Sequence, residues 1–379
     1  MTLCTAFDFE ILHRSKISRA RVGRIHTPHG VIDTPNFVAV GTNGTLKALD
    51  SKTVTEIGLQ LMFCNTYHLL LQPGTEVVRK AGGLHSFIGR NMPIITDSGG
   101  FQVFSLAYGS VADELKSRGQ KSSGNLVLKI DEEGVLFRSY RDGSPILLTP
   151  ESSIAAQKDL GADIIIPFDE LPPYHIGEEA LTRSIDRTHR WEERSLAAHQ
   201  ARPQGQAMYA VIHGGAHLEL RAKSCAHLTQ LPFDGYAIGG SMGKSKDEME
   251  KILSFTLPLL PEDKPNHLLG MGDLESIGRG IPLGIDTFDS SYPTRAARHG
   301  VLLTKNGAVK IEKSIYAEDF GPVEEGCTCT TCTHYSAAYL HHLFKAKELT
   351  ALTLATIHNL HKMCEHMADV RRQIAQDLV

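Results

Sequence analysis

The sequence predicts an α/β protein of the (β/α)8 or TIM-barrel class, and three observations support this prediction. Short apolar runs that stop abruptly at Gly, Asn, Asp or His recur along the chain, as expected of buried parallel strands. Segments with helical spacing, such as residues 150–160 and 177–198, lie between most of the runs. Eight such units fit a chain of 379 residues. The runs are residues 37–40, 61–63, 93–96, 163–168, 208–212, 236–238, 267–269 and 285–288.

Two segments do not fit a minimal barrel. Residues 108–129 are polar and rich in Gly, Ser and Lys, so we expect an inserted surface loop within a barrel core of residues 1–300. Residues 301–346 follow the last run and contain a group of cysteines, which predicts a small subdomain. Residues 347–379 are expected to form a C-terminal helix that packs on the barrel. Its apolar positions at helical spacing are Leu349, Leu352, Ile357, Leu360, Met367, Val370 and Ile374.

Charge and hydropathy exclude several classes of protein. The net charge is −4, from 39 basic and 43 acidic residues, which argues against a protein that coats nucleic acid but allows a local basic patch. No apolar run approaches the roughly 18–20 residues that span a membrane, and the N-terminus lacks the layout of a signal peptide. We therefore expect a cytoplasmic protein without a membrane partner.

Three of the seven cysteines lie close together, at Cys327, Cys329 and Cys332, whereas the others are scattered singly. This spacing does not suit a disulfide framework and indicates metal ligands in a reducing compartment. Zn²⁺ prefers four nitrogen or sulfur ligands, and a closed set is typical of a structural site. A histidine would complete the set, and a ligand on the final helix would tie that helix to the cysteine loop. The candidates are His334, His341, His342 and His358.

Three acidic residues follow predicted strands at the expected barrel mouth: Asp97, Asp169 and Asp289. Any one of them could be a helix N-cap, but three at the ends of different strands favour chemistry. Asp286 comes three residues before Asp289, and we expect it to be structural because Asp289 is nearer the strand end. Glycines in the same segments allow a flat ligand to approach the backbone. They are Gly99, Gly100, Gly239 and Gly240.

An ordered set of motifs resembles the tRNA-guanine transglycosylases. The motifs are NTYHLLLQPG at 65–74, TDSGGFQVFSL at 96–106, YAIGG at 236–240, FDSSYPTRAARHG at 288–300, and C-x-C-x2-C followed by IHNL at 357–360. The resemblance runs from about residue 31 to the last helix. It implies a barrel with an inserted zinc subdomain. It also implies exchange of guanine at wobble position 34 of tRNAs with GUN anticodons (Asp, Asn, His, Tyr) for a 7-deazaguanine base, preQ1 or queuine.

The resemblance also implies a role for each site residue. Asp289 would attack C1′ of the ribose to form a covalent tRNA intermediate, and Asp97 would be the general acid and base for the two bases. The implied base-binding residues are Asp97, Ser98, Phe101, Asp169, His213, Gly239, Gly240 and Leu269. The implied tRNA-binding residues are Gly270, Met271, Gly272, Asp273, Thr294, Arg295 and Arg298. The implied zinc ligands are Cys327, Cys329, Cys332 and His358, with one structural zinc per chain.

The sequence departs from the family pattern at several positions of the expected base pocket. His213 stands where the family usually has Gln, Leu171 replaces a small Cys, and Ser290 stands where Cys is usual. The loop GGSMGKSK at 239–246, with Lys244, differs from the bacterial pattern. Because these changes affect the base pocket, we hypothesise that the enzyme accepts the complete base queuine, rather than or besides its precursor preQ1.

Alternative functions can be separated by particular residues. A non-catalytic tRNA-binding subunit is disfavoured because Asp97 and Asp289 are both present. The archaeal branch, which acts on the tRNA D-arm, is expected to carry further C-terminal domains. A barrel hydrolase with a catalytic metal would need ligands at strand ends, whereas the metal-type ligands here follow the barrel. The expected partners are guanine-34 tRNA, a deazaguanine base and a second copy in a homodimer.

Overall fold

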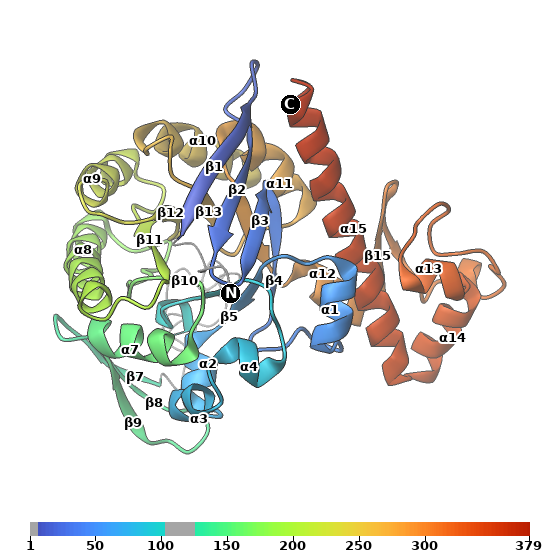
Figure 1. The fold of residues 1–379 in the computed structure, drawn as a ribbon, viewed down its shortest axis with the longest axis horizontal. Coiled ribbons are helices and arrows are strands. Elements are labelled where there is room, and N and C mark those ends of the chain that lie inside the picture. The colour runs from blue at the N-terminus through green and yellow to red at the C-terminus, as the bar shows by residue number, and fades with distance from the viewer. Residues whose placement is uncertain (1–6, 103–125) are drawn as a thin grey trace.

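Eight parallel strands form a closed barrel surrounded by helices in the computed structural model, which describes residues 7–102 and 126–379 (Figure 1). The first barrel strand, β4, pairs with the last, β14, with Thr287 opposite Asn36 and Ser290 opposite Ala39. Each apolar run of the sequence overlaps one barrel strand, so the (β/α)8 prediction is confirmed. In order around the barrel the strands are β4 (Asn36–Val40), β5 (Met62–Cys64), β6 (Ile94–Thr96), β10 (Ile164–Ile165), β11 (Ala207–Ile212), β12 (Gly235–Ile238), β13 (Asn266–Leu268) and β14 (Thr287–Ser290).

Most of the barrel strands are apolar on both faces because the interior is filled and helices cover the outside; β13 and β14 are the more polar ones. Alternate residues such as Phe63 and Val211 belong to one cluster, and their neighbours Met62 and Ile212 belong to another that includes helix residues. The helices around the barrel are α1 (Ser51–Ile57), α2 (Thr66–Leu71), α3 (Thr75–Lys80), α4 (Leu84–Ile88), α7 (Pro150–Leu160), α8 (Glu178–Ala201), α9 (Leu218–Leu228), α10 (Lys246–Thr256), α11 (Leu274–Gly280) and α12 (Tyr292–Arg298).

An antiparallel sheet of β1 (Asp8–Arg14), β2 (Arg21–Thr27) and β3 (Gly30–Thr34) packs at the N-terminal end of the barrel strands. Ile25 and Ile32 of this sheet are fully buried in the cluster that fills the barrel. The β2–β3 turn is anchored by Asp163, whose carboxylate accepts hydrogen bonds from the rings of His29 at 2.7 Å and His85 at 3.0 Å. It also accepts one from the amide of Ile94 at 2.8 Å.

A second antiparallel sheet lies between β6 and α7, formed by β7 (Val127–Ile130), β8 (Val135–Arg138) and β9 (Pro145–Leu148). Phe137 and Leu148 of this sheet pack with Trp191 of α8 in a buried cluster. The predicted insertion at 108–129 lies outside the described residues except for 126–129. Of these, 127–129 belong to strand β7, so the prediction of a loop is wrong for those residues. The helix predicted at 150–160 matches α7, which begins at a Thr149 capping box.

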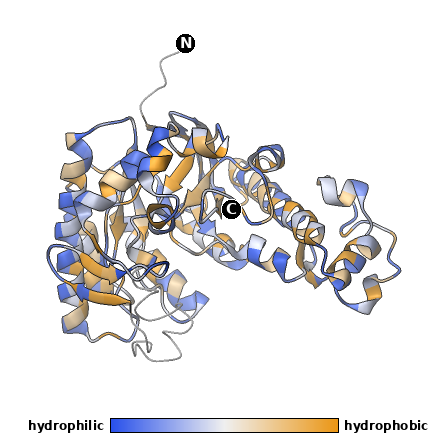
Figure 2. Cartoon of the chain, turned by 90° about the horizontal axis from the view of Figure 1, so that it is seen from below, coloured by the Kyte–Doolittle hydropathy of each residue, from blue (hydrophilic) through white to orange (hydrophobic). Residues whose placement is uncertain are grey.

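The chain after the barrel extends away from it (Figure 2). It contains the hairpin β15 (Val301–Thr304) and β16 (Gly307–Lys310), followed by α13 (Thr330–His334), α14 (Ala337–Ala346) and α15 (Leu349–Ala375). Helix α15 contacts both this segment and β2, β4 and α12. Asn359 of α15 links the two, because its amide donates to the carbonyls of Pro293 and Val301 and its oxygen accepts from the Leu303 amide. No helix in the described part of the chain is long and apolar enough to span a membrane.

Candidate active site and metal centre

The predicted base and catalytic residues converge on one rim of the barrel. Since all eight strands run parallel, the residues at their C-terminal ends share that rim. Asp97 follows β6, Asp169 follows β10 and Asp289 lies near the end of β14. His213, Gly239 and Leu269 directly follow β11, β12 and β13 respectively. The sequence prediction that these acids lie at strand ends is therefore confirmed.

Asp97 is a buried carboxyl group held by three donors. The side chain of Asn65 donates at 2.5 Å, the amide of Thr66 at 2.7 Å and the side chain of Gln102 at 3.0 Å. Burial raises the pKa of Asp97 to about 6, although these hydrogen bonds act in the opposite direction. A carboxyl group with this pKa exchanges a proton readily near neutral pH, which is what a general acid and base requires.

Asp169 is held in place through both of its oxygens. The hydroxyl of Ser98 donates to Oδ1 at 2.8 Å, and Nε2 of His213 lies 2.9 Å from Oδ2. Because a carboxylate only accepts, this contact assigns the proton to Nε2 of His213. The backbone on either side of Asp169 is fixed by α8, where Ser195 and Thr188 accept from the neighbouring amides. Asp169 and His213 thus form one hydrogen-bonded unit.

Asp289 is oriented by two donors from β13 and the loop after it. The amide of Gly270 donates to Oδ1 at 2.7 Å, and Nε2 of His267 lies 3.1 Å from the same oxygen. Nδ1 of His267 lies 2.8 Å from the hydroxyl of Thr287 and accepts its proton. Asp289 is 6% exposed. Its two donors fix the orientation of the carboxylate at the rim.

Asp286 has a different environment, as its position in the sequence predicts. It is completely buried and forms an ion pair with Arg21, with Oδ2 2.6 Å from Nη2 and Oδ1 2.9 Å from Nε. It also accepts from the amide of Asn266 at 2.7 Å. These contacts join the N-terminal sheet to β13 and β14, so Asp286 is structural.

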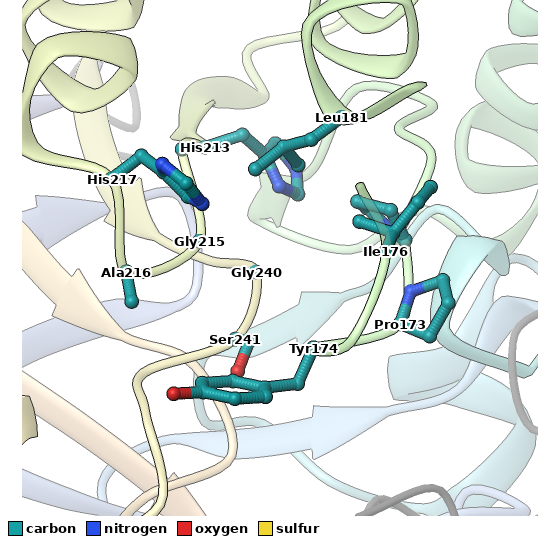
Figure 3. Close-up of a pocket in the computed structure, with 12 residues that line it drawn as sticks. Pro173, Tyr174, Ile176, Leu181, His213, Gly215, Ala216, His217, Gly240 and Ser241 are labelled. Carbon is teal, nitrogen blue, oxygen red and sulfur yellow. The ribbon is translucent and has the colours of Figure 1, made fainter. Parts of the chain in front are cut away.

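A cavity of about 140 Å³ adjoins His213 and Gly240 (Figure 3). Its other walls include Tyr174, Ser241 and the backbone of residues 214–216. None of the residues that line it carries a carboxylate. Of the departures from the family pattern, His213 and the altered loop line the cavity, the loop through Gly240 and Ser241. Lys244 of that loop is not a lining residue; its ammonium lies over the ring of Tyr174, 4.6 Å from the ring centroid. Leu171 is not among the lining residues.

The predicted tRNA-binding residues lie in two segments after β13 and β14. Gly270, Met271, Gly272 and Asp273 form the loop into α11, where Asp273 caps the helix and contacts Lys246 at 2.6 Å. Thr294, Arg295 and Arg298 lie on α12. Thr294 is buried, whereas both arginines are exposed. Phe101, predicted to contact the base, is 49% exposed on the same rim.

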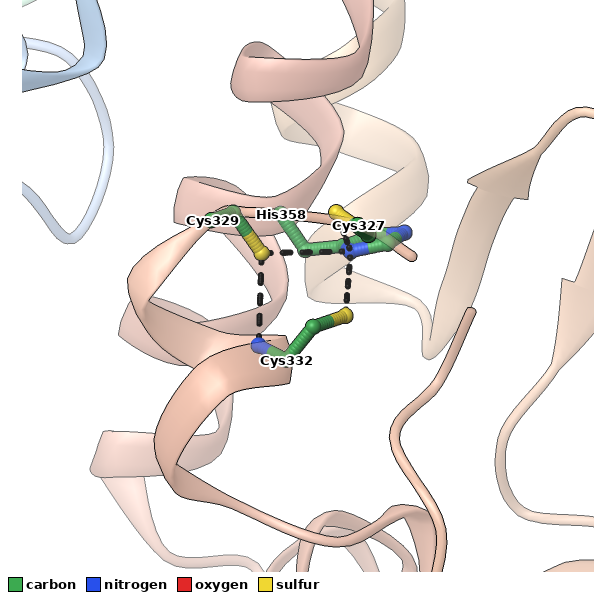
Figure 4. A group of neighbouring side chains, drawn as sticks. All are labelled: Cys327, Cys329, Cys332 and His358. Atoms are coloured by element: carbon green, nitrogen blue, oxygen red, sulfur yellow. Dashed lines mark hydrogen bonds between the residues drawn. The ribbon is translucent and has the colours of Figure 1, made fainter. Parts of the chain in front are cut away.

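The cysteine cluster includes His358 of α15 (Figure 4). Nδ1 of His358 lies 3.9, 3.5 and 3.3 Å from the sulfurs of Cys327, Cys329 and Cys332. Tetrahedral Zn²⁺ with ordinary bond lengths separates nitrogen and sulfur ligands by roughly 3.5 Å. Nε2 of His358 donates to the carbonyl of Leu303 at 2.8 Å, which leaves Nδ1 as the ligand atom. All four side chains are buried, so this group could hold a metal ion.

The other candidate histidines take no part in the cluster. Nδ1 of His334 lies 3.0 Å from the carbonyl of Thr330, and Nδ1 of His341 lies 2.8 Å from that of Ile311. The fourth member of the cluster therefore comes from the long helix.

Sequence reasoning missed the residues that orient the two catalytic candidates. Asn65, Thr66 and Gln102 hold Asp97, and His267 holds Asp289. A signal existed for His267, because it is an ionisable residue at the start of the apolar run at 267–269. Asn65 and Gln102 lie in motifs that carry the family resemblance, but no residue pattern pairs them with Asp97.

A family model described as queuine tRNA-ribosyltransferase matches residues 16–379. The chain belongs to the queuine tRNA-ribosyltransferase family. Family members are pentosyltransferases of the tRNA-guanine transglycosylase type, so the resemblance inferred from the motifs is confirmed. The family match therefore argues against the alternative interpretation of the chain as a barrel metal hydrolase.

Proteins named queuine tRNA-ribosyltransferase resemble the chain over almost its whole length. The protein from Protochlamydia amoebophila (strain UWE25) is 73% identical over 375 residues, which is 99% of this chain and 97% of that protein. The protein from Chlamydia abortus (strain DSM 27085 / S26/3) is 56% identical over 375 residues, 99% of this chain and all of that protein. The protein from Chlamydia caviae is 55% identical over 373 residues, 98% of this chain and 99% of that protein.

Proposed function

We propose that this queuine tRNA-ribosyltransferase family member exchanges guanine at wobble position 34 of GUN-anticodon tRNAs (Asp, Asn, His, Tyr) for a 7-deazaguanine base, as part of queuosine modification. The observation that carries the proposal is the difference between two carboxyl groups on one rim. Asp289 is oriented by an amide and an imidazole, whereas burial raises the pKa of Asp97 to about 6. The environment of Asp289 suits a nucleophile, and that of Asp97 suits a group that carries a proton.

Asp289 is the proposed nucleophile. One of its oxygens attacks C1′ of the ribose, the C1′–N9 bond breaks, and guanine leaves with the bonding electrons and a proton from Asp97. The incoming deazaguanine then loses its N9 proton to Asp97 and attacks C1′, which releases Asp289. The scheme matches double displacement at a glycosidic carbon. It needs no redox cofactor or nucleotide energy source.

The paired groups Asp169 and His213 are proposed to read the edge of the base, together with Ser98 and the backbone of Gly239 and Gly240. Reaching them requires the target base to leave the anticodon stack. Phe101 and Leu269 would contact the face of that base. Flanking nucleotides would contact the loop 270–273 and α12, where the exposed Arg295 and Arg298 are available to phosphates.

Queuine is the proposed incoming base, in preference to preQ1. The cavity beside His213 and Gly240 has room for a further substituent on the base, and its walls combine an aromatic ring, a serine hydroxyl and backbone groups. Such walls suit the hydroxylated ring that distinguishes queuine from its precursor.

The cluster of Cys327, Cys329, Cys332 and His358 is proposed to hold one structural Zn²⁺ per chain. Three thiolates and an imidazole complete a tetrahedral set and leave no open position for a substrate. The metal would join the loop before α13 to α15, away from the barrel rim. We propose a homodimer on the family resemblance alone. A cytoplasmic location is proposed because the clustered cysteines suit a reducing compartment.

The first test loads guanine-34 tRNA with labelled guanine and offers preQ1 or queuine separately. We expect release of label with queuine and weak release with preQ1. A strong preference for preQ1 would contradict the assignment of the base, and no release with either would favour a non-catalytic subunit. Asp289→Asn should abolish a denaturation-resistant enzyme–tRNA adduct. Asp247→Asn, which changes an exposed side chain of α10, should retain the adduct.

A further inference from the structure

Arg221 is a completely buried arginine on α9. Its side chain is 0% exposed, and within the described ranges it forms no ion pair. Burial lowers its pKa to about 10. A buried guanidinium is costly unless its hydrogen bonds are satisfied, so the groups that it binds indicate what it is for.

The guanidinium binds backbone carbonyls at the ends of two neighbouring barrel strands. Nη1 donates to Ile212 at the end of β11 and to Gly239 after β12, both at 2.8 Å. Nη2 donates to Ser241 at 3.0 Å, and Nε donates to Gly215 at 3.0 Å. One side chain of α9 therefore fixes peptides in both loops that border the cavity of Figure 3.

These contacts determine which way the loop amides face. The carbonyl and amide of a trans peptide point in opposite directions. The carbonyl of Gly239 points at Arg221, so the amide of Gly240 points away from it. Gly240 has φ +76°, and a Cβ there would lie 3.1 Å from Nδ1 of His213 and 3.7 Å from Nη2 of Arg221. The loop is thus confined between the base-reading imidazole and the guanidinium.

Helix α9 also lies close to the loop that follows β11. Gly214 has φ +150°, and a Cβ at this position would lie 2.6 Å from the backbone nitrogen of Arg221. The first turn of α9 therefore packs directly against the loop after β11. From this position the fully buried guanidinium reaches the carbonyls at the two strand ends.

We propose that Arg221 is a positioning residue that sets affinity for the exchanged base by fixing the Gly239–Ser241 and Gly215 peptides. The inference rests on the proposed function, because it assumes that these peptides and His213 contact the base. Arg221 acts through them and touches neither the ribose nor the base. Its loss should weaken binding of the base while leaving Asp289 and Asp97 in place.

Arg90 provides a control of similar burial. It is 1% exposed, and burial lowers its pKa to about 10 as well. Its Nη2 donates to the carbonyl of Leu59 at 2.9 Å, before β5 and hence at the other end of the barrel. Arg221→Lys and Arg90→Lys thus remove equally buried guanidinium groups, only one of which lies beside the proposed base site.

The experiment measures exchange kinetics of the full-length, zinc-loaded protein with saturating guanine-34 tRNA and varied incoming base. We expect Arg221→Lys to raise KM for the base about tenfold or more and to change kcat by less than about threefold, as loss of uniform binding predicts. Arg90→Lys should lower the Tm and leave KM unchanged. Equal KM increases in both variants, or a change confined to kcat or Tm in Arg221→Lys, would overturn the inference.

A direct titration with guanine provides a second readout that does not require turnover. Guanine should bind Arg221→Lys about tenfold or more weakly than wild type, and Arg90→Lys normally. An inactive wild-type protein would overturn the proposed function, and this titration would then decide the inference alone. If Arg221→Lys does not fold, Arg221→Gln, which retains a donor for one carbonyl, is titrated instead with the same expected weakening.

Discussion

His267 donates a hydrogen bond from Nε2 to Oδ1 of Asp289 at 3.1 Å, and the hydroxyl of Thr287 fixes the tautomer that allows it. His267 is completely buried in β13, so its ring has no access to solvent. The barrel thereby supplies the carboxylate with a rigid neighbour from the adjacent strand. The relationship makes His267 a positioning residue for the proposed nucleophile.

Replacement of His267 should slow formation of the covalent intermediate. His267→Ala removes one donor to a carboxylate, worth about 1.5–3 kcal/mol, so we expect adduct formation to slow by about 10- to 100-fold. His267→Gln, which can still donate, should recover part of the rate. Single-turnover measurement of enzyme–tRNA adduct after denaturation provides the test. An unchanged rate in a folded His267→Ala protein would show that Gly270 suffices to orient Asp289.

The raised pKa of Asp97 should appear in the pH dependence of stability. The folded protein binds this proton more tightly than the unfolded chain, whose aspartate pKa is about 3.9. The contribution of Asp97 to stability is therefore fully present below about pH 4 and is lost as the pH rises through about 6. The shift corresponds to about 3 kcal/mol, which reflects the cost of burying the charged form.

Urea unfolding of wild type and Asp97→Asn between pH 4 and 8 measures this contribution. The stability of wild type relative to the variant should decrease through this window and level off above about pH 6. A difference that does not vary with pH would mean that Asp97 titrates alike in the folded and unfolded chains.

The barrel could be predicted because its signal is local and repeated. Each strand is a short apolar run that ends at a polar or glycine residue, and α7 carries a Thr149 cap and Pro150 at its start. The three acids at the rim followed from the same pattern, since parallel strands end on one side. Asp286 could be separated from Asp289 by strand alternation and position alone.

Contacts between distant segments could not be predicted in the same way. The pairs Asn65–Asp97 and His267–Asp289 depend on how neighbouring strands are offset, which a single sequence does not specify. The N-terminal sheet was missed because β1 has no fully buried residue and mixes apolar with charged residues, so it lacks the continuous apolar run by which the barrel strands were predicted. From the residues alone the fourth ligand of the cysteine cluster remained open among four histidines, because the loop and α15 meet only in the fold.

Loss of the cysteine cluster should release bound metal and loosen the segment after the barrel. Cys327→Ser removes one of four ligands, so zinc content should fall from about one per chain towards zero. Amide exchange should accelerate in α13, α14 and the part of α15 around His358, while β11 and β12 stay protected. Cys225→Ser is the control, since Cys225 is a buried residue of α9 and lies far from the cluster in sequence. Equal metal loss in both variants would contradict the assigned ligands.

Filling the cavity beside His213 should discriminate between the incoming bases. Ala216 lines this cavity, and Ala216→Leu adds bulk where the ring substituent of queuine is proposed to lie. We expect kcat/KM for queuine to fall about tenfold or more, because overpacking a formed pocket costs about 1–3 kcal/mol, while exchange with guanine and preQ1 changes little. Ala216→Ser, which adds a single oxygen, should retain queuine exchange. Equal losses for all three bases would show that the cavity supports the loop instead of holding the substituent.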